Sequence, residues 1–129
     1  TPYRRVVDGK VSRVEQIKAQ VSQLELVGEQ VWVSSTEKLY LINPDGDVQS
    51  FNLPAELMQT PVYDLYWSKD RLHIAAEPGF FHLEPDGSVT QCQLPDNNNT
   101  AVYKLLKDSS GNNWFCRILW IVRAPEPAS

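Results

Sequence analysis

The sequence has only two cysteines and two histidines in 129 residues, and its longest apolar run covers no more than residues 118–122. Two cysteines do not make a disulfide scaffold, and no Cys-x-x-Cys or Cys/His cluster suggests zinc. A membrane-spanning helix needs about 18 or more apolar residues. The net charge of −4 and the pI of about 5.1 argue against a nucleic-acid partner. We therefore expect no metal or other cofactor, no nucleic acid and no membrane segment. No signal peptide opens the chain, which leaves the compartment open.

A repeat of 41 residues runs through the sequence. Trp32, His73 and Trp114 each occupy the centre of a matching triplet, and the two steps between them are equal. The hairpin sequence Asn-Pro-Asp-Gly at 43–46 recurs as Glu-Pro-Asp-Gly at 84–87. Other segments follow the same step: 21–24 matches 62–65, 39–40 matches 80–81, and 53–54 matches 94–95, while the copy at 102–105 is displaced by 40. A fixed period of this length indicates a repeat architecture.

Each repeat has the pattern of four short strands. In the second unit these are expected at about 61–67, 71–76, 80–84 and 88–94, because β-branched and aromatic runs alternate there with turn residues. Asp-Gly between two such runs favours a hairpin, since Gly adopts positive φ at little cost. A four-stranded unit with this period predicts an all-β fold of β-propeller blades. A β-sandwich is the alternative, but it needs no internal similarity.

The repeats divide the chain into blades over residues 1–123. We expect a half blade at 1–17, blades at 21–54 and 61–95, a partial blade at 101–123, and a tail at 124–129. Closed propellers usually have four to eight blades, so about three blades form an arc with unpaired strand edges. The chain is then a fragment of a longer propeller, or two chains close a six-bladed ring. In both cases we expect the isolated chain to self-associate through its open edges.

The second strand of each unit and its flanks resemble the two-component regulator propeller repeats. Those repeats carry an Asp, a Gly and an apolar-Trp-apolar-Gly-Thr strand, followed by Gly-Leu-aromatic. Asp-Ser-Ser-Gly-Asn-Asn-Trp-Phe at 108–115 is similar to this pattern, as are residues 31–35 with 39–40, and Gly-Phe-Phe at 79–81. The sequence departs from the pattern where His73 replaces the Trp and where Cys116-Arg117 replaces Gly-Thr.

In that family the propellers form the extracytoplasmic sensing part of membrane signalling proteins. The resemblance therefore implies a ligand- or signal-binding sensor domain of a bacterial two-component type protein, located in the periplasm or outside the cell. Its partner would be an unknown small molecule or a protein signal. A protein-interaction or structural propeller without a small ligand is one alternative, and a propeller lyase is another.

Four residues are the candidate ligand-binding positions. The first strand of each propeller blade lines the central channel, where ligands commonly meet the loops that enter it. At matching places there, this sequence has Tyr63 beside Asp64, and Tyr103 beside Lys104. An aromatic ring beside a charge could hold a polar ligand or a partner loop. The alternative is that the two tyrosines pack between blades.

The sequence indicates no catalytic residues. His73 occupies the repeated Trp position, so it is expected to pack within its blade, and His82 is expected to reach solvent or the next blade. Neither histidine falls on a channel-lining position, and no phosphate loop, nucleophile elbow or metal-spaced acid cluster is present. We therefore expect no enzymatic activity.

The cysteines fill repeated positions, whereas two of the four tryptophans do not. Cys92 aligns with an apolar position and Cys116 with a small one, so both are expected to be core thiols. A disulfide between them in an oxidising compartment stays open. Trp67 and Trp120 lie outside the repeated Trp position, and each is a candidate for an exposed interface or for the core.

Overall fold

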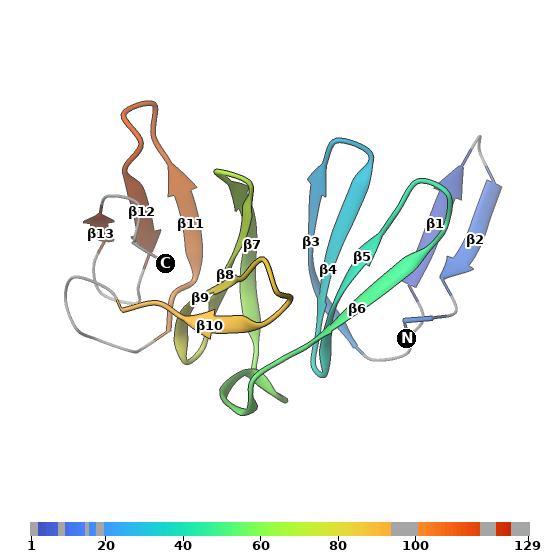
Figure 1. Ribbon diagram of the computed structural model, residues 1–129, viewed down its shortest axis with the longest axis horizontal. Coiled ribbons are helices and arrows are strands. Elements are labelled where there is room, and N and C mark those ends of the chain that lie inside the picture. Colours follow the sequence, from blue (N-terminus) through green and yellow to red (C-terminus); the bar gives the residue numbers. More distant parts are fainter. Residues whose placement is uncertain are drawn as a thin grey trace.

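The computed structural model describes residues 3–7, 10–14, 16–17, 20–93, 101–116 and 121–124. Its strands form four antiparallel sheets, each made of strands that follow one another in the chain (Figure 1). Sheet 0 contains β1 (Tyr3–Val7) and β2 (Lys10–Val14), and sheet 1 contains β3 (Val21–Val27), β4 (Gln30–Ser35), β5 (Lys38–Ile42) and β6 (Val48–Asn52). Sheet 2 contains β7 (Val62–Ser68), β8 (Arg71–Ala76), β9 (Gly79–Leu83) and β10 (Val89–Gln91), and sheet 3 contains β11 (Lys104–Lys107), β12 (Asn113–Cys116) and β13 (Ile121–Ala124). A 3-10 turn, η1 (Ala55–Leu57), lies between sheets 1 and 2 in the chain. The prediction of an all-β fold made of propeller blades is confirmed.

The repeated Trp position is the same place in three sheets. Trp32 pairs with Glu25 on one side and Leu41 on the other. His73 likewise lies between first and third strands of sheet 2, and Trp114 between those of sheet 3. Sheets 1 and 2 also share a register shift near the start of the first strand, between Val21 and Gln23 and between Val62 and Asp64. The sequence period therefore corresponds to equivalent positions in successive sheets.

The two Pro-Asp-Gly hairpins are built in the same way. Gly46 and Gly87 have φ values of 93° and 89°, which a residue with a side chain rarely adopts. In each hairpin the Asp side chain accepts a hydrogen bond of 2.9 Å from the backbone N–H two residues later. The last two sequence matches of the second unit, at residues 94 and 95, lie outside the described residues, and β10 ends at Gln91.

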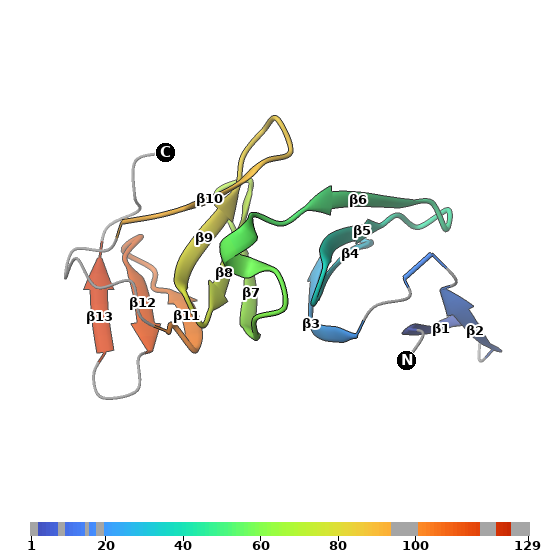
Figure 2. The same cartoon turned by 90° about the horizontal axis from the view of Figure 1, so that it is seen from below.

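The sheets stand side by side with their first strands along one side of the molecule. Figure 2 shows β3, β7 and β11 along that side and β6 and β10 along the opposite one. Buried apolar residues fill the junctions between sheets: one cluster includes Trp32, Leu57, Leu65 and Phe81 between sheets 1 and 2, a second joins sheets 2 and 3, and a third joins sheet 1 to Val14 and Ile17. This is the packing of propeller blades, in which neighbouring sheets bury the faces that they turn toward each other.

Sheet 3 has a face against which no other described sheet packs, although the Arg123 guanidinium lies 5.7 Å from the centre of the Trp114 ring there. Leu106 and Ile121 are 58% and 67% exposed, and Trp114 between them is half-buried. Cys116 is exposed as well, so the expectation that it lies in the core is wrong, whereas Cys92 is buried as expected. The equivalent Ser34 and Ala75 are buried because a following sheet packs over them. Both cysteines are thiols in this structure.

Candidate functional site

The four predicted binding residues lie together where sheet 2 meets sheet 3. Tyr63 and Asp64 lie near the start of β7, and Tyr103 and Lys104 stand at the start of β11. Tyr63 is the residue at the register shift in β7, where a bulge re-aims a side chain relative to regular strand alternation. The rings of Tyr63 and Tyr103 are in contact, with centroids 4.6 Å apart and planes tilted by 49°. Both rings are half-buried, so each keeps surface open to solvent.

A carboxylate holds the first of these tyrosines. The hydroxyl of Tyr63 donates a 2.6 Å hydrogen bond to Oε2 of Glu77, in the exposed β8–β9 hairpin. That bond, together with slight burial and the nearby negative charge, raises the pKa of Tyr63 to about 12. The phenol therefore stays protonated across the neutral range. We call Tyr63, Glu77, Tyr103, Asp64 and Lys104 the tyrosine cluster.

Asp64 and Lys104 have different roles in the tyrosine cluster. Asp64 is buried, and its Oδ2 accepts a 2.9 Å hydrogen bond from the backbone N–H of Leu105. Its other oxygen lies 3.5 Å from the Lys104 ammonium, whose side chain is 71% exposed. A pair this exposed at one end contributes little to stability. Asp64 is thus committed to the sheet 2–sheet 3 junction, while Lys104 offers a cation to solvent.

At the junction between sheets 1 and 2, a carboxylate also accepts a hydrogen bond from a backbone N–H of the next sheet. Oε2 of Glu25, on β3, accepts a 2.9 Å hydrogen bond from the backbone N–H of Trp67 on β7. The two bonds join residues 42 and 41 positions apart, so each spans one repeat. First strands are edge strands with unpaired N–H groups. At each of these two junctions, one carboxylate satisfies such a group on the next sheet; we call these two bonds the junction latches.

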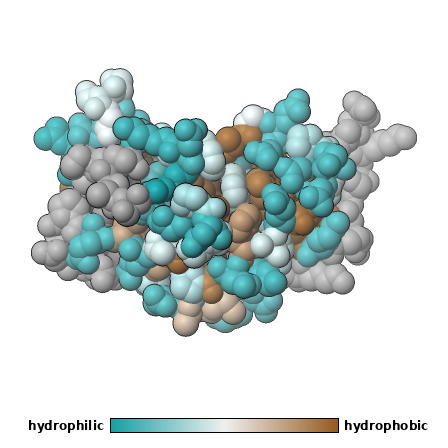
Figure 3. All heavy atoms as spheres, in the orientation of Figure 1, coloured by the Kyte–Doolittle hydropathy of each residue, from teal (hydrophilic) through white to brown (hydrophobic). Residues whose placement is uncertain are grey.

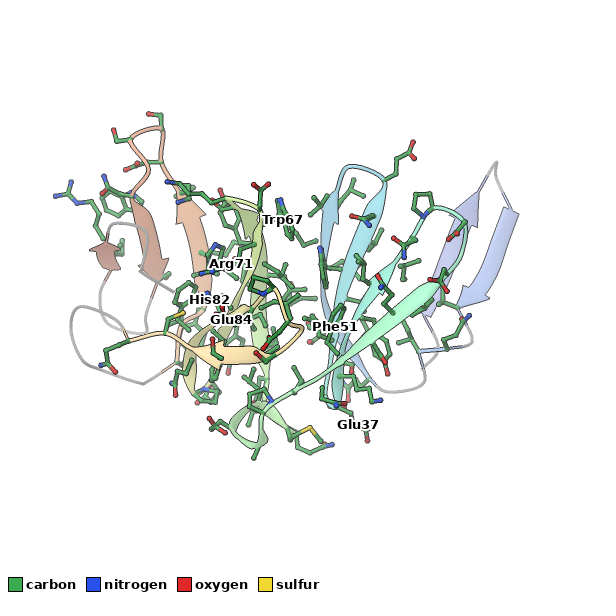
Figure 4. The ribbon with its side chains drawn as sticks, in the orientation of Figure 1. Glu37, Phe51, Trp67, Arg71, His82 and Glu84 are labelled. Atoms are coloured by element: carbon green, nitrogen blue, oxygen red, sulfur yellow. The ribbon has the colours of Figure 1, made fainter. Side chains whose placement is uncertain are left out.

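A cavity of about 520 Å³ lies between sheets 1 and 2, at the opposite end of the strands from the tyrosine cluster. Its apolar wall includes Trp32, Phe51 and Trp67, and the hairpins at 69–70 and 84–87 form its rim. Figure 4 shows Phe51, Trp67, Arg71 and Glu84 around this space. In the space-filling view, hydrophobic residues gather between the two central sheets, with hydrophilic residues on both sides (Figure 3).

A polar group borders the cavity. Arg71 Nη1 donates a 2.8 Å hydrogen bond to Nδ1 of His82, and Arg71 Nη2 lies 3.8 Å from Glu84. His82 is only 3% exposed and stacks against His73 and Phe80, so it does not reach solvent. Sheet 1 has an uncharged pair at the positions equivalent to Arg71 and Glu84. There, Gln30 Nε2 donates a 2.8 Å hydrogen bond to Oδ1 of Asn43.

Sequence reasoning missed the cavity, although one signal for it exists. The 41-residue alignment puts Arg71 opposite Gln30 and Glu84 opposite Asn43, so a neutral pair becomes a charged one in the second unit only. Trp67 was a candidate for an interface or the core; it is half-buried, stacks on Trp32 and lines the cavity. Trp120 lies outside the described residues.

The described residues contain no group of three or more side chains that could hold a metal ion. Within the same part of the chain, no helix is long and apolar enough to cross a membrane.

No family model and no curated protein matches the chain. Solved structures do. The extracellular domain of a putative hybrid two-component system from B. thetaiotaomicron aligns with a TM-score of 0.72 at 14% identity, over 87% of this chain and 16% of that one. A second structure of the extracellular domain of the same protein, described there as a putative one-component system, aligns with a TM-score of 0.65 at 21% identity, over 81% of this chain and 15% of that one.

A lyase shares the fold as well. Catalytically inactive virginiamycin B lyase from Staphylococcus aureus, solved with quinupristin, aligns with a TM-score of 0.72 at 20% identity, over 93% of this chain and 43% of the lyase. This corrects the expectation of no enzymatic activity, because enzymes are among the proteins with this arrangement of sheets. The fold by itself does not separate a binding propeller from a catalytic one.

The chain spans less than half the length of each of these structures. At 14–21% identity, the likeness speaks for the fold alone. The resemblance to two-component regulator propellers is confirmed at that level, since extracellular domains of such systems are among the similar structures. The chain has the fold of successive blades of a β-propeller.

Proposed function

We propose that this chain is part of a sensor propeller outside the cytoplasm, and that its signal binds at the tyrosine cluster. The observation that carries the proposal is the contact between Tyr63 and Tyr103, which come from adjacent blades and stand beside exposed Lys104. A ligand there would touch two blades at once, so its binding would depend on how the blades are placed. The similar extracellular domains of signalling proteins support this role and location.

The chemistry of the tyrosine cluster favours a small polar ligand with an anionic group. Lys104 supplies the exposed cation, and the two half-buried rings supply flat surfaces against which an apolar part can pack. The protonated hydroxyl of Tyr63 is already held by Glu77, which fixes its ring rather than leaving it to rotate. Protein signals with an exposed acidic loop would meet the same groups.

The test is a thermal-shift screen of the chain against amino acids, small carboxylic acids and sugar acids at millimolar concentration. We expect at least one anionic compound to raise the melting temperature, because a ligand that binds only the folded state stabilises it. Its affinity should fall about tenfold or more in Tyr103→Ala, which removes ring contact, and in Lys104→Ala, which removes the cation.

The matched control is Lys38→Ala, which removes an exposed lysine at the start of β5, outside the tyrosine cluster. Lys38→Ala should bind as the unchanged chain does. The proposal fails if no anionic compound shifts the melting temperature, or if Lys38→Ala weakens binding as much as Lys104→Ala.

We further propose that isolated chains associate through the open face of sheet 3. Leu106→Lys is expected to lower the sedimentation coefficient toward that of a monomer, because the lysine would carry a charge into an apolar contact. Gln49→Lys adds the same charge at an exposed position on β6 and should leave sedimentation unchanged. Equal sedimentation of all three chains at the same concentration would refute the proposed contact.

A further inference from the structure

The cavity between sheets 1 and 2 has the construction of a second binding site. Its volume of about 520 Å³ falls within the range of small-molecule pockets in proteins. It lies at the end of β7 that carries the β7–β8 hairpin, whereas the tyrosine cluster lies at the start of that strand. A ligand in the cavity would therefore not touch the tyrosine cluster.

Three aromatic side chains form its apolar wall. Trp32 and Trp67 stack with centroids 6.1 Å apart and planes 19° apart, and Phe51 lies 5.5 Å from Trp32. Trp67 and Phe51 are half-buried, so they keep surface that the opposite sheet does not cover. Such surfaces favour flat, polarisable molecules, which can pack face-on or edge-on against the rings.

Trp32 also has an unused hydrogen-bond donor. Its side chain is 5% exposed, and its indole N–H has no hydrogen-bond partner among the described residues. Trp114 occupies the same place in sheet 3, and there Nε1 donates a 2.9 Å hydrogen bond to Oδ2 of Asp108. This bond is the main reason that the pKa of Asp108 lies below its usual range. Asp108 lies in the hairpin between the first two strands of sheet 3. The matching hairpin of sheet 1 has only the two residues Gly28 and Glu29, so it has no aspartate at that place.

A buried N–H group without an acceptor costs free energy, because it has lost its hydrogen bonds to water. A ligand that offers the Trp32 N–H an acceptor would recover that free energy on binding. Because Trp32 and Trp114 share a register position, we expect the two indole N–H groups to aim toward the same end of their strands. That is the end at which Lys69 and Asp70 line the cavity.

The charges around the cavity balance. Lys69 and Asp70 carry opposite charges on one hairpin, and Arg71 is paired with Glu84 at 3.8 Å. Arg71 also donates to His82, so its guanidinium is held from two sides. An ionic ligand would therefore find no excess of either sign among the lining residues. The lining therefore selects against charged molecules and for neutral ones.

We propose that this cavity binds an uncharged, planar aromatic molecule that carries a hydrogen-bond acceptor. The rings of Trp32, Trp67 and Phe51 pack against its flat surface, and the indole N–H of Trp32 donates to its acceptor. This site does not rest on the proposed function of the tyrosine cluster, and each can fail without the other.

The test uses 6-propionyl-2-dimethylaminonaphthalene, an uncharged naphthalene with one ketone, whose emission shifts to the blue in an apolar environment. Titrating it into the full chain is expected to give a saturable blue shift, with energy transfer from tryptophan. Leu83→Trp narrows the cavity from the β9 side and Pro85→Trp narrows it from the exposed rim. Each should weaken binding about tenfold or more. Trp32→Phe, which keeps a ring but lacks the N–H, should weaken it about threefold to tenfold.

The control is Leu106→Lys, on the apolar open face of sheet 3, where such a dye could also bind. Circular dichroism verifies that each variant is folded, and Pro85→Trp keeps the test informative if Leu83→Trp does not fold, because Pro85 is exposed. Unchanged binding in Leu106→Lys supports the proposal. The proposal is overturned if the unchanged chain gives no saturable shift, if folded Pro85→Trp binds as tightly as the unchanged chain, or if Leu106→Lys abolishes binding. Equal affinity of Trp32→Phe overturns the assigned hydrogen bond.

Discussion

Replacing Phe81 with alanine is expected to lower the free energy of unfolding by about 3–5 kcal/mol. Phe81 is fully buried in β9 and packs in the cluster that joins sheet 2 to sheet 1. Its removal takes apolar surface out of the junction and leaves a cavity that the paired strands cannot close. Urea denaturation monitored by tryptophan fluorescence measures the loss. A domain of this size has about 5–15 kcal/mol of stability in total, so the variant should unfold at far lower urea concentration.

The control is Leu26→Ala on β3, because Leu26 is 69% exposed and loses few contacts on truncation. Its effect should stay within about 0.5 kcal/mol. If Phe81→Ala and Leu26→Ala unfold at the same urea concentration, sheets 1 and 2 do not share the packed junction described above.

Replacing Asp64 with alanine is expected to cost about 2–3 kcal/mol of stability. The change removes an ionised acceptor and leaves the N–H of Leu105 without its partner at a buried junction. Asp64→Asn keeps an acceptor oxygen in place and should cost less than about 1 kcal/mol. Glu25→Ala breaks the other junction latch, but Glu25 is half-buried, so water can replace more of its bond. Its cost should lie between those of the two Asp64 variants.

Urea denaturation at neutral pH measures all three variants. The contrast between Asp64→Ala and Asp64→Asn tests the acceptor at equal charge, since both variants lose the carboxylate charge and only Asp64→Asn keeps an acceptor oxygen and nearly the original side-chain volume. Equal losses in these variants would show that the charge of Asp64 matters, and that neither its side-chain volume nor its acceptor oxygen for the Leu105 N–H does.

The fold could be predicted because its evidence is local and repeated. Each Pro-Asp-Gly hairpin identifies a turn within a few residues, and the equal spacing of Trp32, His73 and Trp114 relates one sheet to the next. The same spacing put Tyr63 and Tyr103 at matching positions of adjacent blades as candidate ligand-binding residues, but it did not predict that their rings touch. The ligand at that contact was not predictable, because the spacing places the residues but does not define the shape of a bound molecule.

The features that sequence analysis missed depend on pairs of sheets rather than on one repeat. The cavity combines Phe51 of one sheet with Arg71 and Glu84 of the next, and these residues have no common period. His82 is buried because Arg71 and the stacked ring of His73 surround it, which strand alternation alone does not indicate. Cys116 has the sequence environment of a buried position, yet it is exposed because no described sheet covers that face.

The junction latches give the row of sheets a polarity. In both cases the acid belongs to the earlier sheet and the amide to the later one, but Glu25 and Asp64 occupy different positions of the repeat, which Tyr66 and Gln23 fill in the other sheet. Sheet 3 ends this pattern, since the positions that align with Glu25 and Asp64 are Leu106 and Lys104. A sheet packed after sheet 3 would meet an apolar side chain and a cation at these two positions. A duplicated last unit would therefore lack both carboxylate acceptors at its new junction.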